Sequence, residues 1–278
     1  MSEIIKVENL SFSYPNSSKV LDKIDLKIKK GEMITIFGPS GSGKTTLIYC
    51  LSGIIPHLIE GKLTGNVFIK GKNTKKMKMK EITKYVGVVL QDPESQIFGL
   101  TVEEDISFGL ENLGLNDKEI EERVNKILDF MGLKKYRDFN PRLLSGGQKQ
   151  KLVIGSVLAM DPEIIFLDEP FSNIEPKFKL EIFQILHSLK REGKTIILVE
   201  RKIPEFLSPI DRFVLIDSGK ILVEGEPEKF FTELEKMKYS KIHIPQIVSI
   251  YSQLRKLGFL TNMPLSVEEL EREVLSCL

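Results

Sequence analysis

Cysteines and long hydrophobic runs are scarce in this sequence. The two cysteines, Cys50 and Cys277, lie far apart, so they predict neither a disulfide framework nor a zinc site and fit a reducing compartment. No uninterrupted apolar run approaches the roughly 18 residues that a membrane-spanning helix needs, so any membrane role must come through a partner. The first residues show no basic region followed by a long apolar run, and we therefore expect no signal peptide.

An excess of charge of either sign is also missing. Lysine and arginine total 40 and aspartate and glutamate total 39, which gives a net charge of +1. Because proteins that bind nucleic acid usually have a basic surface, we expect no nucleic-acid partner. The 278 residues and their 41% apolar content are enough for a large core or for two lobes.

The stretch around Lys44 is the most specific motif that is present. A buried-strand pattern at residues 33–37 leads into it, and a helix-compatible segment, residues 44–51, follows. Together they give G-x-x-x-x-G-K-[ST] in the strand–turn–helix context that a phosphate-binding loop requires. The predicted nucleotide-binding residues are Gly38, Pro39, Ser40, Gly41, Ser42, Gly43, Lys44, Thr45 and Thr46.

The chemistry of this phosphate loop suits a nucleoside triphosphate. Glycines let successive N–H groups point inward at an anion, and the start of a helix adds partial positive charge. Lys44 can reach the β- and γ-phosphates, and Thr45 can offer its hydroxyl to Mg²⁺. A plain Gly/Ser connection between a strand and a helix is the alternative, but every fixed position of the motif is present.

Polar residues follow two further buried strands. Residues 164–167 are apolar and end at Asp168 and Glu169, which suits Mg²⁺ coordination by the first and water activation by the second. Residues 85–90 end at Gln91, which a strand end near the phosphate loop would bring to the ligand. Either could be an ordinary polar strand exit, but the pairing with the phosphate loop favours the functional interpretation of the carboxylates.

Alternating apolar residues on both sides of residues 15–18 predict an antiparallel sheet before the phosphate loop. Tyr14, at the end of its first strand, either stacks on adenine or is a surface tyrosine. Residues 102–160 are predicted to be helical, with Asn116 and Glu119 as a capping box, and they interrupt the α/β pattern.

A second Ser/Gly-rich turn lies inside this helical block and leads a helical run, so it can bind phosphate. One ATP needs one such helix start for its β- and γ-phosphates, and an inserted lobe would separate the two helix starts of one chain. We therefore expect two chains placed head to tail, so that ATP closes the pair and hydrolysis releases it. The residues of this turn, offered to the ATP of the other chain, are Leu144, Ser145, Gly146, Gly147 and Gln148.

The predicted fold class is α/β: a P-loop NTPase core with an antiparallel β subdomain, an inserted α-helical subdomain and a small C-terminal helical appendage. The ATP-binding domain is expected at residues 1–233, with its helical subdomain at about residues 92–160, and the C-terminal helical extension at residues 234–278. Residues 217–220 give a hairpin signal between two short strands.

The ordered motifs resemble those of ABC-type ATPases over roughly residues 3–230. The resemblance implies that Tyr14 stacks on adenine and that Gln91 senses the γ-phosphate and Mg²⁺. It implies that Asp168 orients Mg²⁺ and that Glu169 is the general base, with ATP and Mg²⁺ as cofactors. The motifs that carry it are the phosphate loop, Gln91, residues 144–148 and residues 164–169.

A narrower resemblance is to the ATPase subunits of energy-coupling factor (ECF) transporters. It is carried by residues 55–65 and by residues 91–105. It implies a prokaryotic importer of vitamins or transition-metal ions, with this chain at the cytoplasmic face of the cell membrane. Two ATPase subunits, often non-identical, would drive a membrane scaffold subunit, and a separate small membrane protein would capture the substrate. The resemblance also implies that the lobe after Gln91 docks the scaffold's cytoplasmic helices.

Two positions depart from that family. Arg201 follows Glu200, where histidine is usual; arginine stays charged and can hold a γ-phosphate, but it cannot relay a proton. Glu175 stands where aspartate is usual, at the end of the dimer-interface loop that also contains Ser172 and Asn173. We expect an asymmetric heterodimer in which Arg201 weakens the catalytic site on this chain's own phosphate loop. The alternative is that Arg201 substitutes well and both sites turn over.

Other functions fit the sequence less well. Soluble ABC-type ATPases of DNA repair or translation usually carry tandem cassettes, a long coiled coil or a basic surface, and this sequence shows none of them. A clamp that binds ATP without hydrolysing it is favoured by Arg201 and disfavoured by Glu169. A P-loop kinase would leave residues 144–148 unexplained.

Overall fold

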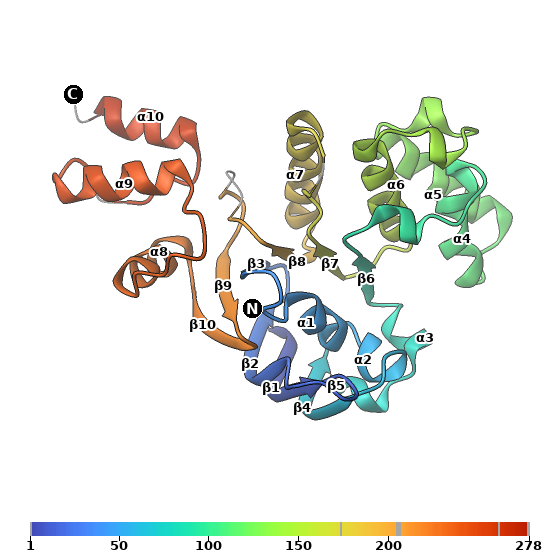
Figure 1. Ribbon diagram of the computed structural model, residues 1–278. Coiled ribbons are helices and arrows are strands. Elements are labelled where there is room, and N and C mark those ends of the chain that lie inside the picture. Colours follow the sequence, from blue (N-terminus) through green and yellow to red (C-terminus); the bar gives the residue numbers. More distant parts are fainter. Residues whose placement is uncertain (1, 173, 204–206, 261, 277–278) are drawn as a thin grey trace. The chain divides into compact units, whose positions relative to one another are not determined.

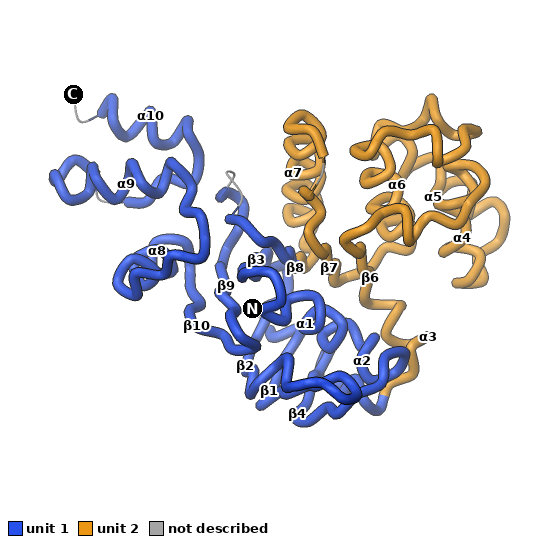
Figure 2. Tube along the Cα trace, in the orientation of Figure 1, with its two compact units in different colours: residues 1–76, 197–278 blue, residues 77–196 orange. Residues whose placement is uncertain are grey.

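The computed structural model describes the chain except for residues 1, 173, 204–206, 261 and 277–278 (Figure 1), so the predictions for Asn173 and Cys277 lie outside the described residues. The chain divides into two compact units (Figure 2). Unit 1 comprises residues 1–76 and 197–278, and unit 2 comprises residues 77–196. Among the described residues, no helix combines the length and the apolar composition that crossing a bilayer requires.

Unit 1 contains the predicted antiparallel sheet, with the strand order β2-β1-β4-β5. In β2, Ile24, Leu26 and Ile28 are buried and the residues between them are exposed, so alternation directs the apolar face of the strand into the core. The first strand ends at Ser13, so Tyr14 lies just beyond it. The bounds are β1 (Glu3–Ser13), β2 (Leu21–Lys29), β4 (Lys62–Ile69) and β5 (Lys72–Asn73).

A second set of strands in unit 1 leads into the phosphate loop. Buried strand β3 pairs in parallel with β9, and β9 forms the predicted antiparallel hairpin with β10. After the loop, α1 buries Cys50, and this burial raises the pKa of the Cys50 thiol to about 12, which keeps it protonated. The bounds are β3 (Met33–Phe37), β9 (Arg212–Asp217), β10 (Lys220–Gly225), α1 (Lys44–Leu51), α2 (Ile54–His57) and η1 (Thr74–Lys76). Strand β8 (Thr195–Glu200) begins in unit 2 and continues into unit 1 from residue 197.

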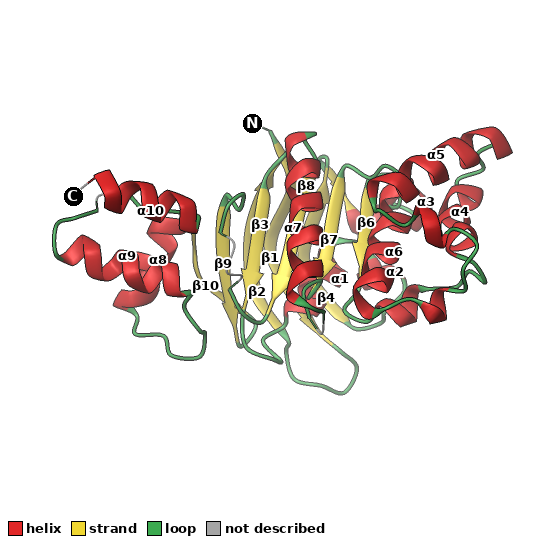
Figure 3. Cartoon of the chain, turned by 90° about the horizontal axis from the view of Figure 1, so that it is seen from above, coloured by secondary structure: helices red, strands yellow, loops and turns green. Residues whose placement is uncertain are grey.

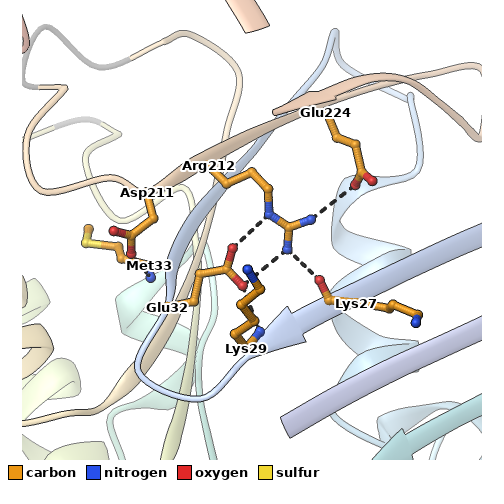
Figure 4. Close-up of polar contacts among 7 residues, drawn as sticks. All are labelled: Lys27, Lys29, Glu32, Met33, Asp211, Arg212 and Glu224. Atoms are coloured by element: carbon orange, nitrogen blue, oxygen red, sulfur yellow. Dashed lines mark hydrogen bonds and ion pairs between the residues drawn. The ribbon is translucent and has the colours of Figure 1, made fainter. Parts of the chain in front are cut away.

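A half-buried guanidinium joins the two sets of strands (Figure 4). Arg212 donates from Nε and from one Nη atom to the two carboxylate oxygens of Glu32, at 2.8 and 3.2 Å. The same side chain donates to the carbonyl oxygen of Lys27 and to the carboxylate of Glu224. Glu32 also accepts from the backbone N–H of Lys29 at 2.7 Å. Because this pattern needs the planar fork of arginine, lysine could not replace it. The network fixes the entry into β3, the strand that leads into the phosphate loop.

Three helices follow β10 and gather on its side of unit 1 (Figure 1 and Figure 3). The first of them, α8, packs on β9 and β10, where Phe230 and Phe231 join Phe213 and Phe37 in one cluster of rings. The expected domain boundary after residue 233 falls inside α8, and the division of the chain there stays a prediction. The bounds are α8 (Pro227–Lys236), α9 (Gln246–Lys256) and α10 (Val267–Ser276).

Unit 2 holds the predicted helical block and a parallel pair of strands, β6 and β7. Thr101, Asn116 and Ser145 each begin a helix with a capping box. The predicted α/β fold class, with an antiparallel β subdomain and a helical subdomain, is confirmed. The bounds are β6 (Val86–Val89), β7 (Ile164–Asp168), α3 (Met79–Ile82), α4 (Val102–Asn112), α5 (Asp117–Phe130), α6 (Gly146–Ala159), α7 (Pro176–Arg191), η2 (Pro93–Gln96), η3 (Lys134–Tyr136) and η4 (Pro141–Leu143).

Candidate functional site

The phosphate loop of unit 1 is shaped around the side chain of Lys44. Gly41 and Gly43 have φ angles of 77° and 102°, which residues with a side chain rarely adopt, so the loop needs glycine to turn there. Lys44 is buried, and its Nζ atom donates to the carbonyl oxygens of Gly38 and Pro39 at 2.8 and 2.9 Å. The ammonium is therefore held inside the loop, at the start of α1.

The hydrogen-bond donors of this loop are suited to binding the phosphates of a nucleotide. Ser42 Oγ is buried and has no hydrogen-bond partner among the residues that the structure describes. A buried polar group without a partner costs about 1–3 kcal/mol, which a ligand oxygen can recover. The start of α1, the ammonium of Lys44 and this hydroxyl together supply positive charge and donors for an anion. The residues present therefore fit the phosphates of ATP.

Tyr14 lies beside the start of α1. Its hydroxyl is 3.1 Å from Oγ1 of Thr46, and its ring packs edge-on against Phe12 with the centroids 4.9 Å apart. Thr46 is buried and Thr45 is half-buried, whereas Ser40 of the loop is exposed. These contacts hold the half-buried tyrosine ring next to the phosphate loop. Its stacking on adenine stays a prediction.

In unit 2, β7 ends at the two predicted carboxylates. Asp168 is the last residue of the strand and Glu169 follows it, and both are buried. Glu169 has a φ angle of 49°, in the left-handed region. Ser172 closes this turn, because its backbone N–H and its hydroxyl donate to the carbonyl oxygen of Glu169 at 3.0 and 2.9 Å. Gln91 donates from Nε2 to Glu169 Oε2 at 3.1 Å. Unit 2 thus brings Gln91, Glu169 and Ser172 together.

The predicted Mg²⁺ ligands come from both units: Thr45 from unit 1, and Gln91 and Asp168 from unit 2. Hydroxyl, amide and carboxylate oxygens are the donors that Mg²⁺ prefers. Within the described ranges, no group of three or more His, Cys, Asp or Glu side chains could hold a metal ion. A Mg²⁺ site formed from these three residues stays a prediction.

The signature turn (residues 144–148) opens α6 in unit 2. Ser145 is the N-cap: its N–H donates to Gln148 Oε1 at 2.9 Å, and its Oγ accepts from the N–H of Gln148 at 3.4 Å. Gln148 Nε2 also donates to the Tyr136 hydroxyl at 2.8 Å. Ser145 and Gly146 are exposed. Because the Ser145 hydroxyl accepts in the capping box, its own proton remains for a donation outward.

Leu144 and Gly147 of the signature turn are buried, so they do not share this exposure. A Cβ atom on Gly147 would lie 2.3 Å from Cγ of Phe178 in α7. Glycine is therefore needed at this position for α6 and α7 to pack closely. From the sequence, Gly147 was predicted only to act on a partner's ATP, and its packing against Phe178 was not predicted.

Three other predicted residues lie at element ends. Glu175 is the exposed N-cap of α7, and within the described residues its side chain makes no capping hydrogen bond. Glu200 is the buried last residue of β8, and the exposed Arg201 follows it in unit 1. The roles of Glu175 and Arg201 stay predictions.

The segment after β6 is ordered by side-chain contacts that were not predicted from the sequence. The side-chain amide of Gln96 pairs with backbone groups at the end of β6, as a neighbouring strand would. Its Oε1 accepts from the N–H of Leu90 at 2.6 Å, and its Nε2 donates to the carbonyl oxygen of Val88 at 3.1 Å. Lys149 of α6 pairs with Glu94, and this contact holds the pKa of the Glu94 carboxyl below its usual value. No local periodicity marks these contacts, so they could not be predicted from spacing.

Asp105 fixes the other end of the same segment. It is buried in α4, and its Oδ1 accepts from the N–H groups of Phe98 and Gly99 at 2.8 and 3.1 Å. Its Oδ2 accepts from Ser156 Oγ of α6 at 2.8 Å. The signal in the sequence is an aspartate at the buried face of an otherwise amphipathic helix, a position where an unpaired carboxylate would be costly.

A phosphate loop between a buried strand and a helix, and a second strand that ends in two buried carboxylates, define a P-loop ATPase. The ABC transporter family profile matches residues 21–172, and the chain belongs to the ABC transporter family. It is 43% identical over 273 residues to an ABC transporter ATP-binding protein of Pyrococcus abyssi, covering 98% of both chains. It is 35% identical over 277 residues to the energy-coupling factor transporter ATP-binding protein EcfA of Methanothermobacter thermautotrophicus, covering 99% of this chain and 88% of that one. Some relatives are longer: the chain covers 43% of the length of an ABC transporter ATP-binding protein of Methanosarcina mazei.

Solved structures agree with this assignment. The cbiO1 protein of Clostridium perfringens, described as part of the ABC transporter complex cbiONQ, has a TM-score of 0.74 and 31% identity, over 86% of this chain and 94% of that one. The ATP-binding cassette MJ0796, in a dimeric post-hydrolysis state with ADP and Pi, has a TM-score of 0.69 and 28% identity, over 80% and 98%. The chain is thus the ATP-binding subunit of an ABC transporter, and its reaction is ATP hydrolysis coupled to transport.

Proposed function

We propose that this chain is the ATPase subunit of an ECF-type importer of vitamins or transition-metal ions. The observation that carries the proposal is that the similarity to EcfA extends past the cassette, through α8, α9 and α10. The segments that resemble ECF subunits, residues 55–65 and 91–105, support it independently. In this proposal, residues 1–233 form the ATP-binding domain with a helical subdomain at about residues 92–160, residues 234–278 form the extension, and the subunit lies at the cytoplasmic face of the membrane.

The proposed working unit is a head-to-tail pair of ATPase subunits. Lys44 and Ser42 of one subunit hold the terminal phosphates, and the signature turn of the other subunit covers them. Support comes from the exposure of Ser145 and Gly146 and from the proton that Ser145 retains for donation. Because the capping box fixes the helix start before ligand arrives, little ordering cost is left for closure.

The proposed hydrolysis uses side chains of unit 2. Glu169 accepts the proton of the attacking water, and Gln91 keeps the carboxylate oriented through its hydrogen bond to Oε2. Ser172 holds the turn that presents Glu169. When bound, Mg²⁺ neutralises charge on the phosphate oxygens, and Thr45, Gln91 and Asp168 are the proposed residues that hold it.

The proposed docking surface for a membrane scaffold lies in unit 2, in the segment after β6. Phe98 and Leu100 are 71% and 74% exposed, and the Phe98 ring contacts that of the exposed Phe108 with centroids 5.9 Å apart. Exposed aromatic and aliphatic side chains that gather in one segment are typical of an interaction site. Asp105 and Gln96 keep the backbone of this segment in place. We propose that cytoplasmic helices of the scaffold bind here.

We further propose that the second ATPase subunit is non-identical. Arg201 cannot relay a proton as a histidine could, so the site on this chain's phosphate loop would turn over slowly. Glu175 adds a methylene at the proposed dimer interface, in the loop that Ser172 begins. The signature turn of this chain would still serve the partner's site.

The test is an ATPase assay on this chain alone, on the reconstituted pair, and on the pair with Glu169→Gln. We expect low hydrolysis by the single chain, high hydrolysis by the pair, and a partial loss with Glu169→Gln, since the partner's site remains. The exposed Glu192→Gln serves as the matched control and should leave the rate unchanged. Full activity of the single chain, or a total loss in the Glu169→Gln pair, would contradict the asymmetric pair.

The docking surface is tested by purification from detergent-solubilised membranes. Phe98→Ser with Leu100→Ser should release the scaffold subunit, whereas Leu222→Ser, at an exposed leucine of β10 in unit 1, should not. Retention of the scaffold by the double variant would contradict the proposed surface. If the wild-type chain never co-purifies with a membrane protein, the proposal that it serves an ECF-type transporter is contradicted.

A further inference from the structure

The turn between β9 and β10 lies against the phosphate loop in unit 1. Ser218 and Gly219 have φ angles of 50° and 75°, as in a two-residue hairpin turn. The N–H of Gly219 donates to the carbonyl oxygen of Ser42 at 3.1 Å, and the carbonyl oxygen of Gly219 accepts from the N–H of Asp22 at 2.9 Å. A Cβ on Gly219 would lie 2.3 Å from the carbonyl oxygen of Val20. The turn is therefore wedged between the phosphate loop and the start of β2.

The first glycine of the phosphate loop touches the same part of β9. A Cβ on Gly38 would lie 2.1 Å from the carbonyl oxygen of Ile216, which is too close for any side chain. The loop thus rests on β9 and on its turn, at Gly38 and again at Ser42. Because packed interiors transmit strain, a displacement of the turn must move the loop backbone that receives phosphate.

The segment after α8 holds this turn through Asp217. The Tyr239 hydroxyl and the Lys241 ammonium both donate to Asp217 Oδ2 at 2.8 Å, and Ser218 Oγ donates to Oδ1 at 3.1 Å. The Lys241 contact, followed by that of Tyr239, lowers the pKa of the Asp217 carboxyl, while burial and the carboxylate raise the pKa of Tyr239. Hydrogen bonds to an ionised acceptor are among the strong ones. They tie residues 239–241 to the turn.

We propose that Asp217 is a positioning residue. Through it, the C-terminal helical extension (residues 234–278) sets the affinity of the phosphate loop for nucleotide. The contacts run from Tyr239 to Asp217 and along the turn to Gly219. Gly219 then bonds to Ser42. Because linkage is reciprocal, bound nucleotide tightens residues 239–241 as much as the Tyr239 contact tightens nucleotide binding. The proposal depends on nucleotide binding by the phosphate loop and not on the type of transporter.

The test compares two full-length variants that lose the same chemical group. Tyr239→Phe removes the hydroxyl that reaches Asp217. Tyr251→Phe, the matched control, removes a hydroxyl that donates to the Glu228 carboxylate at 3.1 Å, between α9 and α8. The readout is the Kd for a fluorescent ADP analogue. We expect Tyr239→Phe to raise the Kd about fivefold, the lower end of common coupling strengths, and Tyr251→Phe to leave it unchanged. Lys241→Met should act in the same direction as Tyr239→Phe.

Hydrogen exchange supplies a readout that does not depend on turnover. ADP should slow amide exchange at Gly219 and at residues 239–241 in the wild type, and Tyr239→Phe should remove the effect at residues 239–241. An unchanged Kd in Tyr239→Phe, an equal rise in both tyrosine variants, or no protection of residues 239–241 by ADP would each overturn the proposal.

Discussion

Replacing Gly147 with alanine separates two roles of the signature turn. The added Cβ would lie 2.3 Å from Cγ and 2.8 Å from Cβ of Phe178, and ordinary contact begins at 3.4 Å, so α6 and α7 must part by about 1 Å. Overpacking of this kind costs about 1–3 kcal/mol, against which alanine recovers up to about 1 kcal/mol of helix propensity. Folding should therefore survive. A misplacement of about 1 Å at the start of α6 can nevertheless reduce turnover on the order of a hundredfold.

The assay pairs urea unfolding with ATP hydrolysis by the assembled transporter. Gly147→Ala should unfold at slightly lower urea and lose most of its hydrolysis. Adding Phe178→Ala should restore part of the hydrolysis, because it removes the two closest ring atoms and leaves only the Phe178 Cβ at 2.8 Å. Gly155→Ala is the control: it lies in the same helix, where its Cβ would meet Ile127 at 3.0 Å, and it should affect stability alone. If hydrolysis by the double variant does not rise at all above that of Gly147→Ala, packing against Phe178 is not the reason for the glycine.

Two further predictions concern stability. Arg212→Met leaves the Glu32 carboxylate buried without its guanidinium partner, and we expect unit 1 to lose about 2–4 kcal/mol in urea unfolding. Lys27→Met, which breaks an exposed pair with Glu3, should have no measurable effect on stability. Equal losses of stability in Arg212→Met and Lys27→Met would refute the reasoning. The second prediction concerns Arg137, which lowers the pKa of the Glu103 carboxyl. This pair therefore stabilises the fold fully above the usual Glu pKa of 4.5, and the stabilisation is lost as pH falls through the lowered pKa. Arg137→Met should lower the urea midpoint at pH 7 and flatten its fall below pH 4.5; a parallel pH profile would contradict this.

Features set by neighbouring residues could be predicted from the sequence. The strand–turn–helix around Lys44, the capping box at Asn116 and the hairpin at residues 217–220 all form as expected. In each case the interacting groups lie within a few positions, so spacing and residue type determine the local geometry. The burial of Asp168 and Glu169 also follows from their place at the end of an apolar strand.

Contacts between distant residues could not be predicted in this way. Nothing near Gly147 in the sequence indicates that Phe178 will occupy the space beside it. The tie between Tyr239 and Asp217 joins the extension to a hairpin, and no periodic pattern encodes it. Such pairings depend on tertiary packing, which one sequence considered by itself does not disclose. The roles proposed for Arg201 and Glu175 stay predictions for the same reason.

The left-handed backbone at Glu169 implies a compromise between durability and turnover. In that conformation a residue with a Cβ has a steric cost of about 1–2 kcal/mol, and glycine has almost none. Selection for thermal endurance alone would therefore favour glycine there, at the expense of the carboxylate. If this chain were evolved in the laboratory for heat resistance alone, without selection for activity, we expect Glu169 to be replaced by glycine. The resulting subunit would be more stable and inactive.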